Sequence, residues 1–283
     1  MITIESITNR NLSAALLTCT FNKPSTLSVG DLMLVIIGRS EDSGVTYTPP
    51  SGFATVFNTN QTLDDEAQLY VSYKIATSDD VSASTFVFTD NSSVVNEGGV
   101  MYQIRDADPT NPIKGSNSGV VQNSNTPSCG GISSMSANCL LIISQISSRS
   151  TGTASNFAIG TDNPTWTIDV NQTTVSGVQA GFSSASALRS ASTSTGNASC
   201  SAGVTTSEQV IGIIAIEPKT LFTTLSSDSV SVSDSTPDTK MIFVMNQNDS
   251  VSSQDSVSSS KSRHWNNSNK ASSSSFTNEE KSI

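Results

Sequence analysis

The fold is decided by one apolar run, Val29-Gly30-Asp31-Leu32-Met33-Leu34-Val35-Ile36-Ile37-Gly38. Turn-forming residues close it at both ends, and it shows neither helix caps nor a 3.6-residue period. A short unbroken apolar run between turn signals is typical of a strand buried on both faces. The run is also too short for a membrane span, which needs about 20 apolar residues. We therefore predict that it forms a central β-strand.

A second run of this kind, Asn138-Cys139-Leu140-Leu141-Ile142-Ile143-Ser144-Gln145-Ile146, indicates that the strand plan occurs twice. Four landmarks recur in the same order, at offsets of 108, 113, 107 and 111 residues: Leu32 at Leu140, Phe53 at Trp166, Val71 at Val178, and Tyr102 at Ile213. Nearly constant spacing favours an internal duplication. The alternative is one large sandwich built from both halves.

The remaining apolar segments of residues 1–219 are short and separated by Gly, Pro, Asn and Asp. Residues 68–75 alternate apolar and polar side chains, and residues 84–89 repeat this with Phe86 and Phe88. Period-two alternation indicates strands with one inward face, and no segment shows a convincing helical period. We predict an all-β fold of two tandem β-sandwich, jelly-roll-like lobes, residues 1–113 and 114–219.

Composition limits the classes of partner. The chain has 283 residues, 35% hydrophobic and 13% charged, against typical values of about 45–50% (a count that includes Gly) and about 25%. Its net charge is −10, with a pI near 4.4. Binding to nucleic acid depends on Lys and Arg that neutralise phosphates. We therefore expect neither nucleic acid nor a membrane as partner.

After Glu217-Pro218-Lys219 the composition changes, because the last 64 residues contain 20 serines. We predict an extended Ser-rich arm over residues 220–283, too poor in apolar residues to form a core. Its apolar run, Met241-Ile242-Phe243-Val244, is interpreted as a strand added to the sheet edge of a partner, and Trp265 as a further partner contact. The alternative is a solvated tail.

Cysteine usage and the N-terminus indicate the compartment. Cys19, Cys129, Cys139 and Cys200 form no CxxC pair and match no zinc spacing. Buried free thiols are the favoured interpretation, with a Cys129–Cys139 disulfide as the alternative. The first residues show neither a basic n-region nor an apolar h-region, so we expect neither signal peptide nor anchor, and synthesis in a cytoplasm.

The sequence offers no reaction centre. The single histidine, His264, lies in the Ser-rich arm, which argues against a histidine triad in the lobes. Acidic clusters at Asp64-Asp65-Glu66 and Glu41-Asp42 are most simply charged loops. Asp106 and Asp108, with Asn111, are the best calcium candidates, although a Pro-rich turn explains them equally well. We predict no catalytic residue, no cofactor and no enzymatic activity.

Aromatic residues leave one alternative open. Most fit strand positions, so packing in the core is the default. Tyr47 and Tyr70 can instead point outward, and an exposed ring near a loop would suit stacking on a sugar. A glycan-binding module is therefore kept as the alternative function.

Four motifs carry a resemblance to a family. They are Gly30-Asp31-Leu32-Met33-Leu34, Thr48-Pro49-Pro50-Ser51-Gly52-Phe53, Tyr73-Lys74-Ile75-Ala76-Thr77, and the segment from Gly98-Gly99-Val100 to Arg105-Asp106-Ala107. In this order they resemble the β-rich structural proteins of tailed bacteriophages, with their GDLL strand, PPxGW corner, YKxA strand and closing RGV-like strand. The chain departs from that pattern at Phe53, where Trp is common, and at Arg105-Asp106, where Arg-Gly is common.

The resemblance covers residues 14–113 well, residues 126–218 loosely, and the arm not at all. It implies a virion structural protein of tail, fibre or capsid-decoration type. Partners would be other virion proteins and copies of itself, and its location the virion, after synthesis in the bacterial host cytoplasm. The alternative is a receptor- or glycan-binding module of a fibre. The motifs are structural, so they carry over no catalytic residue.

Overall fold

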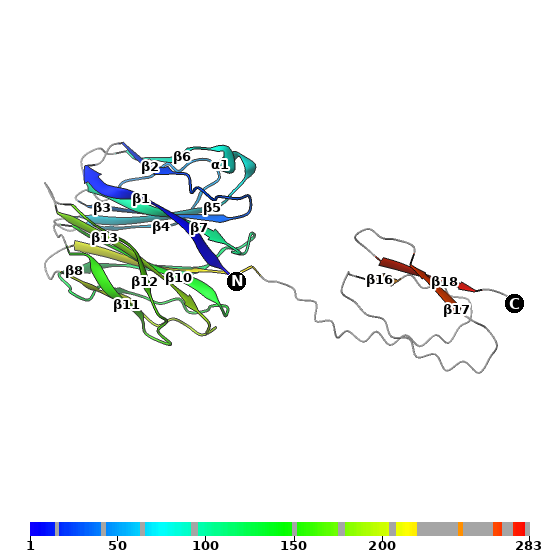
Figure 1. Cartoon of the computed structure of the whole chain (residues 1–283). Helices are drawn as coiled ribbons and strands as arrows, with labels where there is room; N and C mark the ends of the chain where they lie inside the picture. Colours follow the sequence, from blue (N-terminus) through cyan, green and yellow to red (C-terminus); the bar gives the residue numbers. More distant parts are fainter. Residues whose placement is uncertain are drawn as a thin grey trace. The chain divides into compact units, whose positions relative to one another are not determined.

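The computed structural model describes residues 1–14, 17–40, 44–62, 66–91, 96–148, 152–174, 179–203 and 208–219, and the backbone of three strands beyond them. The chain divides into two compact units, Met1–Thr220 and Leu221–Ile283. The first unit is all-β, as predicted, and consists of two β-sandwich lobes (Figure 1). In the described part of the chain, no helix is long and apolar enough to cross a membrane.

The first lobe pairs a five-stranded main sheet with a two-stranded cover sheet. The first main sheet has the order β1 (Thr3–Ala14), β7 (Asn96–Arg105), β3 (Leu32–Ser40), β5 (Ala67–Ile75) and β4 (Ala54–Gln61). The first cover sheet consists of β2 (Thr18–Asn22) and β6 (Thr85–Thr89). All nine residues of β3 are buried, which confirms the predicted central strand.

The second lobe repeats this design. The second main sheet has the order β12 (Thr167–Thr173), β13 (Ala180–Arg189), β10 (Cys139–Ser148), β15 (Glu208–Ile216) and β8 (Ile113–Gln122). The second cover sheet has the order β11 (Ala154–Ile159), β14 (Ala198–Ala202) and β9 (Ser128–Cys129). Strand β10 corresponds to the second apolar run and is buried along its whole length.

The two main sheets match strand for strand, β1-β7-β3-β5-β4 corresponding to β8-β15-β10-β13-β12. Their irregularities match as well. A register shift skips Val56 on β4, and the shift on β12 skips Asp169, 113 positions later. Another skips Glu5 on β1, and its counterpart skips Lys114 on β8. Matched bulges indicate that the strand plan occurs twice in detail, since bulges are specific features of a strand pair.

Two of the four sequence landmarks need comment. The register pairs Leu34 with Tyr102 and Ile142 with Ile214, so the counterpart of Tyr102 is Ile214 rather than Ile213. The predicted match was wrong by one residue, which moves a side chain to the opposite face because strands have a period of two. Val178 lies outside the described residues.

The main sheets pack face to face and share one apolar core. This core includes Leu34 and Ile36 from β3, Ile142 from β10 and Phe182 from β13, all fully buried. The outward faces of the main sheets form two further cores under the cover sheets. The result is a stack of four layers (Figure 1). Each buried Leu, Ile or Phe side chain contributes about 1.5–3 kcal/mol relative to exposure.

Contacts between the main sheets follow an approximate twofold symmetry. Strand β3 lies against its counterpart β10, whereas β1 lies against β12 and β4 against β8. Such exchanged contacts are characteristic of an isologous interface. Glycines allow the close approach. A Cβ on Gly38 would lie 2.6 Å from the Phe182 ring, and one on Gly212 would lie 2.6 Å from the Phe57 ring.

One helical turn was missed by the sequence analysis. Helix α1 (Ser78–Ser82) follows β5, and Thr77 caps it in a box with Asp80. Five residues are too few to show a helical period, so only the Thr-x-x-Asp spacing could have indicated the turn.

The second unit is described by three strands in the order β16 (Phe243–Met245), β18 (Ser274–Glu280) and β17 (Arg263–Asn267). Of the predicted partner-binding residues, Met241 and Ile242 lie outside the described residues. Phe243 and Val244 lie in β16, paired with β18 of the same chain, and Trp265 lies in β17. Their binding to a partner stays a prediction.

Candidate functional site

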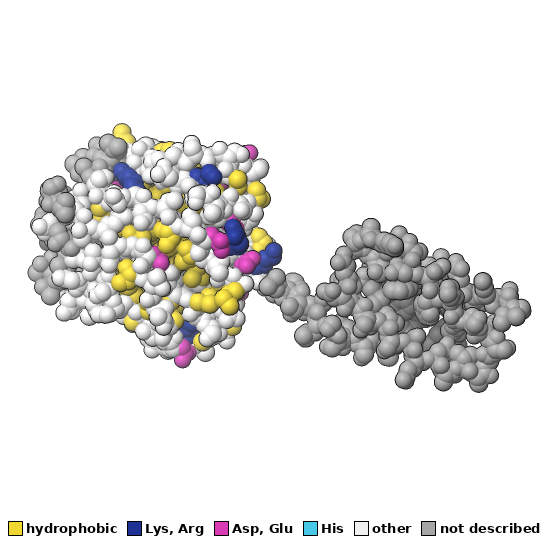
Figure 2. Space-filling model, in the orientation of Figure 1, with side chains coloured by type: hydrophobic (Ala, Val, Ile, Leu, Met, Phe, Trp, Pro, Cys, Tyr) yellow, Lys and Arg dark blue, Asp and Glu magenta, His cyan; other side chains and the backbone are white. Residues whose placement is uncertain are grey.

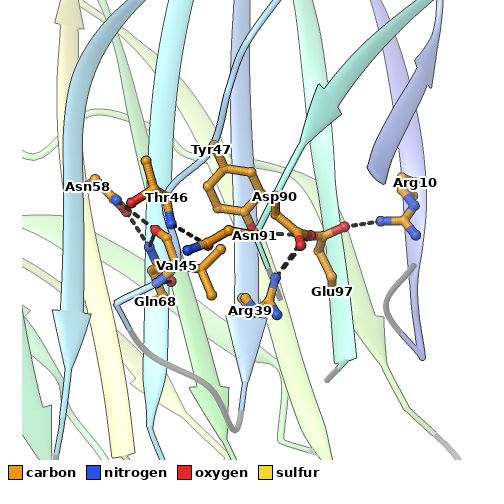
Figure 3. A network of polar contacts seen from close by, with 10 residues as sticks. All are labelled: Arg10, Arg39, Val45, Thr46, Tyr47, Asn58, Gln68, Asp90, Asn91 and Glu97. Carbon is orange, nitrogen blue, oxygen red and sulfur yellow. Dashed lines mark hydrogen bonds and ion pairs between the residues drawn. The ribbon is translucent and has the colours of Figure 1, made fainter. Parts of the chain in front are cut away.

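A network of polar side chains lies inside the first lobe (Figure 3). Strands β3 and β7 place Arg39 opposite Glu97, and both side chains are fully buried. Arg39 Nη1 donates to Asp90 Oδ2 at 3.0 Å and lies 3.6 Å from Glu97 Oε2. The Tyr47 hydroxyl donates to Glu97 Oε2 at 2.8 Å, and Arg10 donates to Glu97 Oε1.

Burial dominates the electrostatics of this network. It raises the pKa of Glu97, while the bond from Tyr47 and the Arg10 guanidinium act in the opposite direction. Burial and the Glu97 carboxylate together raise the pKa of Tyr47 well above its ordinary value. A buried charge is tolerated when it is paired and hydrogen-bonded. Because these groups are buried and bind one another, we interpret the network as one that stabilises the fold.

The network also fixes the segment that follows β3. Gln68 Nε2 donates to the Val45 carbonyl at 2.7 Å and to Asn58 Oδ1 at 2.5 Å. Thr46 N donates to Asn91 Oδ1 at 3.0 Å (Figure 3). Val45 and Tyr47 of this segment belong to the core under the first cover sheet.

A second polar group crosses the central core between the lobes. The Tyr102 hydroxyl lies 2.6 Å from Ser184 Oγ and donates to Asp169 Oδ2 at 3.0 Å. Ser184 Oγ in turn lies 2.7 Å from Ser144 Oγ. Burial raises the pKa of Asp169, which occupies the bulge of β12. These hydroxyl groups connect β7 of the first lobe to β13 and β10 of the second by hydrogen bonds.

The calcium candidates lie in the connection between the lobes. Asp106 Oδ2 is 3.5 Å from the N-terminal ammonium group. Asp108 Oδ1 accepts from the backbone N–H groups of Thr110 and Asn111 at 2.7 and 3.0 Å, which lowers the pKa of Asp108. Within the described residues, no three His, Cys, Asp or Glu side chains are grouped to hold a metal. A calcium role for Asp106 and Asp108 stays a prediction.

The other candidates are placed as follows. Glu41, Asp42, Asp64 and Asp65 lie outside the described residues, and His264 lies in β17. The four cysteines are buried free thiols, as favoured from the sequence. Burial raises the pKa of Cys129 and of Cys200 to about 12.

The expectation that Tyr47 and Tyr70 can point outward was wrong. They are 5% and 2% exposed, and their ring centroids are 4.8 Å apart. The alternation of residues 68–75 suggested one solvent-facing side for this strand. The first cover sheet and its loops bury that side as well.

A cleft opens on the second lobe at the end of β13. Its volume is about 360 Å³, and its lining includes Asp162, Pro164, Thr165, Leu188, Arg189 and Ser190. Arg189 is 2% exposed. It donates to the Thr193 and Ser194 carbonyls at 2.7 and 3.1 Å and lies 3.4 Å from the Asp162 carboxylate. Sequence reasoning missed this cleft because a Ser/Thr-rich loop around one Arg matches no motif.

Comparisons with known proteins add no assignment: no family model, no curated protein and no solved structure matches this chain. Function is therefore argued from the residues themselves.

Proposed function

We propose that this chain is a structural component of a tailed-bacteriophage virion, of tail, fibre or capsid-decoration type. It acts through protein–protein contacts, and its partners are copies of itself and other virion proteins. The four motifs shared with that class support this proposal. The buried polar groups also support it. The ionic network around Glu97 holds a loop of the first lobe, and the Tyr102 hydroxyl connects the two lobes.

The observation that carries the proposal is an uncharged pair of sheet edges. Strands β4 and β8 are edge strands of the two main sheets and lie against each other, with Thr59 Oγ1 2.6 Å from Ser118 Oγ. Strand β4 has no charged residue, and β8 has only Lys114 near its start. Charged residues are one means by which proteins that stay monomeric protect such edges. Here the protection is limited to one bulge in each strand, at Val56 and at Lys114.

The opposite edges differ in this respect. There β1 carries Glu5 and Arg10, and β12 carries Asp169 at its bulge. Two copies that each carry a net charge of −10 repel each other, and meeting surfaces without charge avoid adding to this repulsion at close range. Charged side chains are few on the face of the lobes seen in Figure 2. We assign self-association to the β4–β8 edges.

The proposal is tested by locating the protein in intact particles by electron microscopy, together with edge variants. Ala54→Lys with Val120→Lys places two charges at exposed positions of β4 and β8 and should abolish self-association and incorporation. The control, Thr167→Lys, places one charge at the start of the opposite edge strand β12 and should leave both unchanged. Absence of the protein from particles, or normal assembly of the double variant, would contradict the proposal.

The Ser-rich region is tested separately. Deletion of residues 220–283 should leave soluble, folded lobes, because the first unit forms its own cores. We expect these lobes to stay outside the particle, since the arm is proposed to dock onto another virion protein. Normal incorporation of the truncated chain would refute that role.

A further inference from the structure

The two lobes treat the same corner in different ways. Residues 48–53 precede β4, and residues 161–166 precede β12, 113 positions later. In the first lobe, the chain itself fills this corner. Lys74 Nζ donates to the Ser51 carbonyl at 3.0 Å and to Asp80 Oδ1 of α1 at 2.7 Å, and it lies 6.0 Å from the Phe53 ring centroid.

The second lobe keeps an aromatic residue, Trp166, at the position of Phe53, but it lacks counterparts of Lys74 and of α1. By the strand register, Ala187 stands where the first lobe has Lys74, and its methyl group cannot reach across the corner. Residues 190–196 follow β13, where the first lobe has α1, and they form no helix. The cleft of about 360 Å³ opens at this place. Internal comparison therefore identifies a position that one lobe occupies with its own side chains and the other leaves open.

The walls of the cleft combine apolar and hydrogen-bonding groups. Leu188, 41% exposed, and Pro164 form an apolar side. The Asp162 side chain is 64% exposed, and the hydroxyl residues Thr165 and Ser190 complete the lining. Asp162 has φ +44°, a left-handed conformation that Asp tolerates better than most residues.

Arg189 makes the cleft rigid. Its guanidinium donates to the Thr193 and Ser194 carbonyls and to Thr193 Oγ1 at 2.9 Å, so it fixes the loop that follows β13. It also lies 3.4 Å from Asp162, which fixes that carboxylate from one side. A preorganised acceptor binds at a lower entropic cost than a mobile one.

We propose that this cleft binds one neutral sugar unit. The guanidinium of Arg189 offsets the charge of Asp162, so a cationic ligand gains little, whereas a carboxylate still accepts hydrogen bonds from sugar hydroxyls. Leu188 and Pro164 suit the C–H face of a pyranose ring. The volume lies at the lower end of the range for small-molecule sites. For a ligand of this size we expect a Kd on the order of 1 mM.

Sugar binding goes beyond the assembly role and does not depend on it. The cleft lies at the end of β13, whereas the proposed assembly edges are β4 and β8. A failure of sugar binding therefore leaves the assembly proposal intact, and normal assembly of the edge variants would leave the sugar proposal intact.

The experiment is saturation-transfer NMR on the full-length protein with glucose, galactose, mannose and N-acetylglucosamine at millimolar concentration. We expect transfer to at least one of them. Thr165→Trp should abolish transfer by filling the cleft, and Asp162→Asn should weaken binding about tenfold, the loss of one charge-assisted hydrogen bond. The matched control is Asp79→Asn, an exposed carboxylate on α1 of the first lobe, which should bind normally.

Thermal melts show that each variant is folded before its binding is compared. Transfer to none of the four sugars, or transfer that survives Thr165→Trp in the folded protein, overturns the proposal. N-acetyl-lysine amide serves as the cationic probe. Binding of this probe in the cleft in preference to every sugar also overturns the proposal, because it would show that the Asp162 charge dominates.

Discussion

The two lobes share strand order, bulges and a central core, but they hold their loops with different chemistry. Where the first lobe pairs Arg39 with Glu97, the register of the second lobe pairs Ser147 with Gln209. Gln209 Nε2 donates to the Ser124 carbonyl at 2.7 Å, and Gln145 donates to Gln209. Neutral amides thus perform in one lobe the anchoring that charges perform in the other.

The ion pairs near the bulges also differ in chemistry between the two lobes. At the matched bulges, Arg105 pairs with Glu5 at 2.9 Å in the first lobe, and Lys114 pairs with Glu217 at 3.7 Å in the second. The positions correspond, but the signs of the charges are exchanged. The two lobes therefore repeat the backbone geometry, whereas the polar residues at corresponding positions differ in type and in charge.

The largest expected difference in stability is between removal of Glu97 in the first lobe and removal of its counterpart Gln209 in the second. Glu97→Ala leaves Arg39 and Arg10 with one buried partner fewer, and we expect a loss of about 3–5 kcal/mol in the free energy of unfolding. Gln209→Ala removes a neutral partner and should cost about 1–3 kcal/mol. Urea unfolding of both variants measures the difference, and equal losses would show that charge and amide anchors are equivalent.

The central interface offers a smaller comparison at matched positions. Tyr102→Phe removes the hydroxyl that contacts Ser184 and Asp169, and we expect a loss of about 1 kcal/mol. Its counterpart variant, Ile214→Val, removes one methyl group from the same core at a cost of about 0.5–1.5 kcal/mol. Thermal unfolding tests both. An unchanged Tyr102→Phe stability would mean that the hydroxyl chain contributes nothing to the interface.

The pH dependence of the melting temperature tests the role of Asp169, the residue at the bulge of β12. Burial raises the pKa of Asp169, so its contribution to stability is full below the pKa of an unfolded Asp, about 3.9, and is lost as pH rises through the folded value. Asp169→Asn should therefore raise Tm at pH 7 and change it little at pH 3. Melting curves at both values check this. A Tm gain that is equal at the two pH values would rule out the charge as the cause.

The smallest effect is expected for the exchanged ion pairs. Lys114→Ala and Glu5→Ala each remove one partner of a partly exposed pair, at corresponding bulge positions. Such pairs contribute about 0–1 kcal/mol. We expect both variants to unfold within about 0.5 kcal/mol of the parent chain in moderate salt, where exposed charges are screened. A larger loss in only one lobe would mean that its bulge depends on the ion pair.

Much of the candidate sites could not be predicted, and particular residues show why. The cleft depends on Arg189 reaching the carbonyls of its own loop, and no spacing in the sequence announces such contacts. Tyr47 and Tyr70 looked free to point outward because the sequence does not tell which faces a cover sheet protects. The slip between Ile213 and Ile214 arose because an apolar run buried on both faces carries no alternation from which to read the register.

By itself, the sequence determined the all-β class, the two central strands and the repetition of the strand plan. The apolar runs in β3 and β10 had to be buried on both faces, since exposing them would forfeit their hydrophobic stabilisation. The left-handed turn residues Gly30 (φ +92°) and Asn138 (φ +63°) begin them in corresponding places. Tertiary structure alone decided that the main sheets share one core and that one lobe fills its corner while the other leaves a cleft. These outcomes depend on contacts between residues far apart in the chain, which local patterns do not encode.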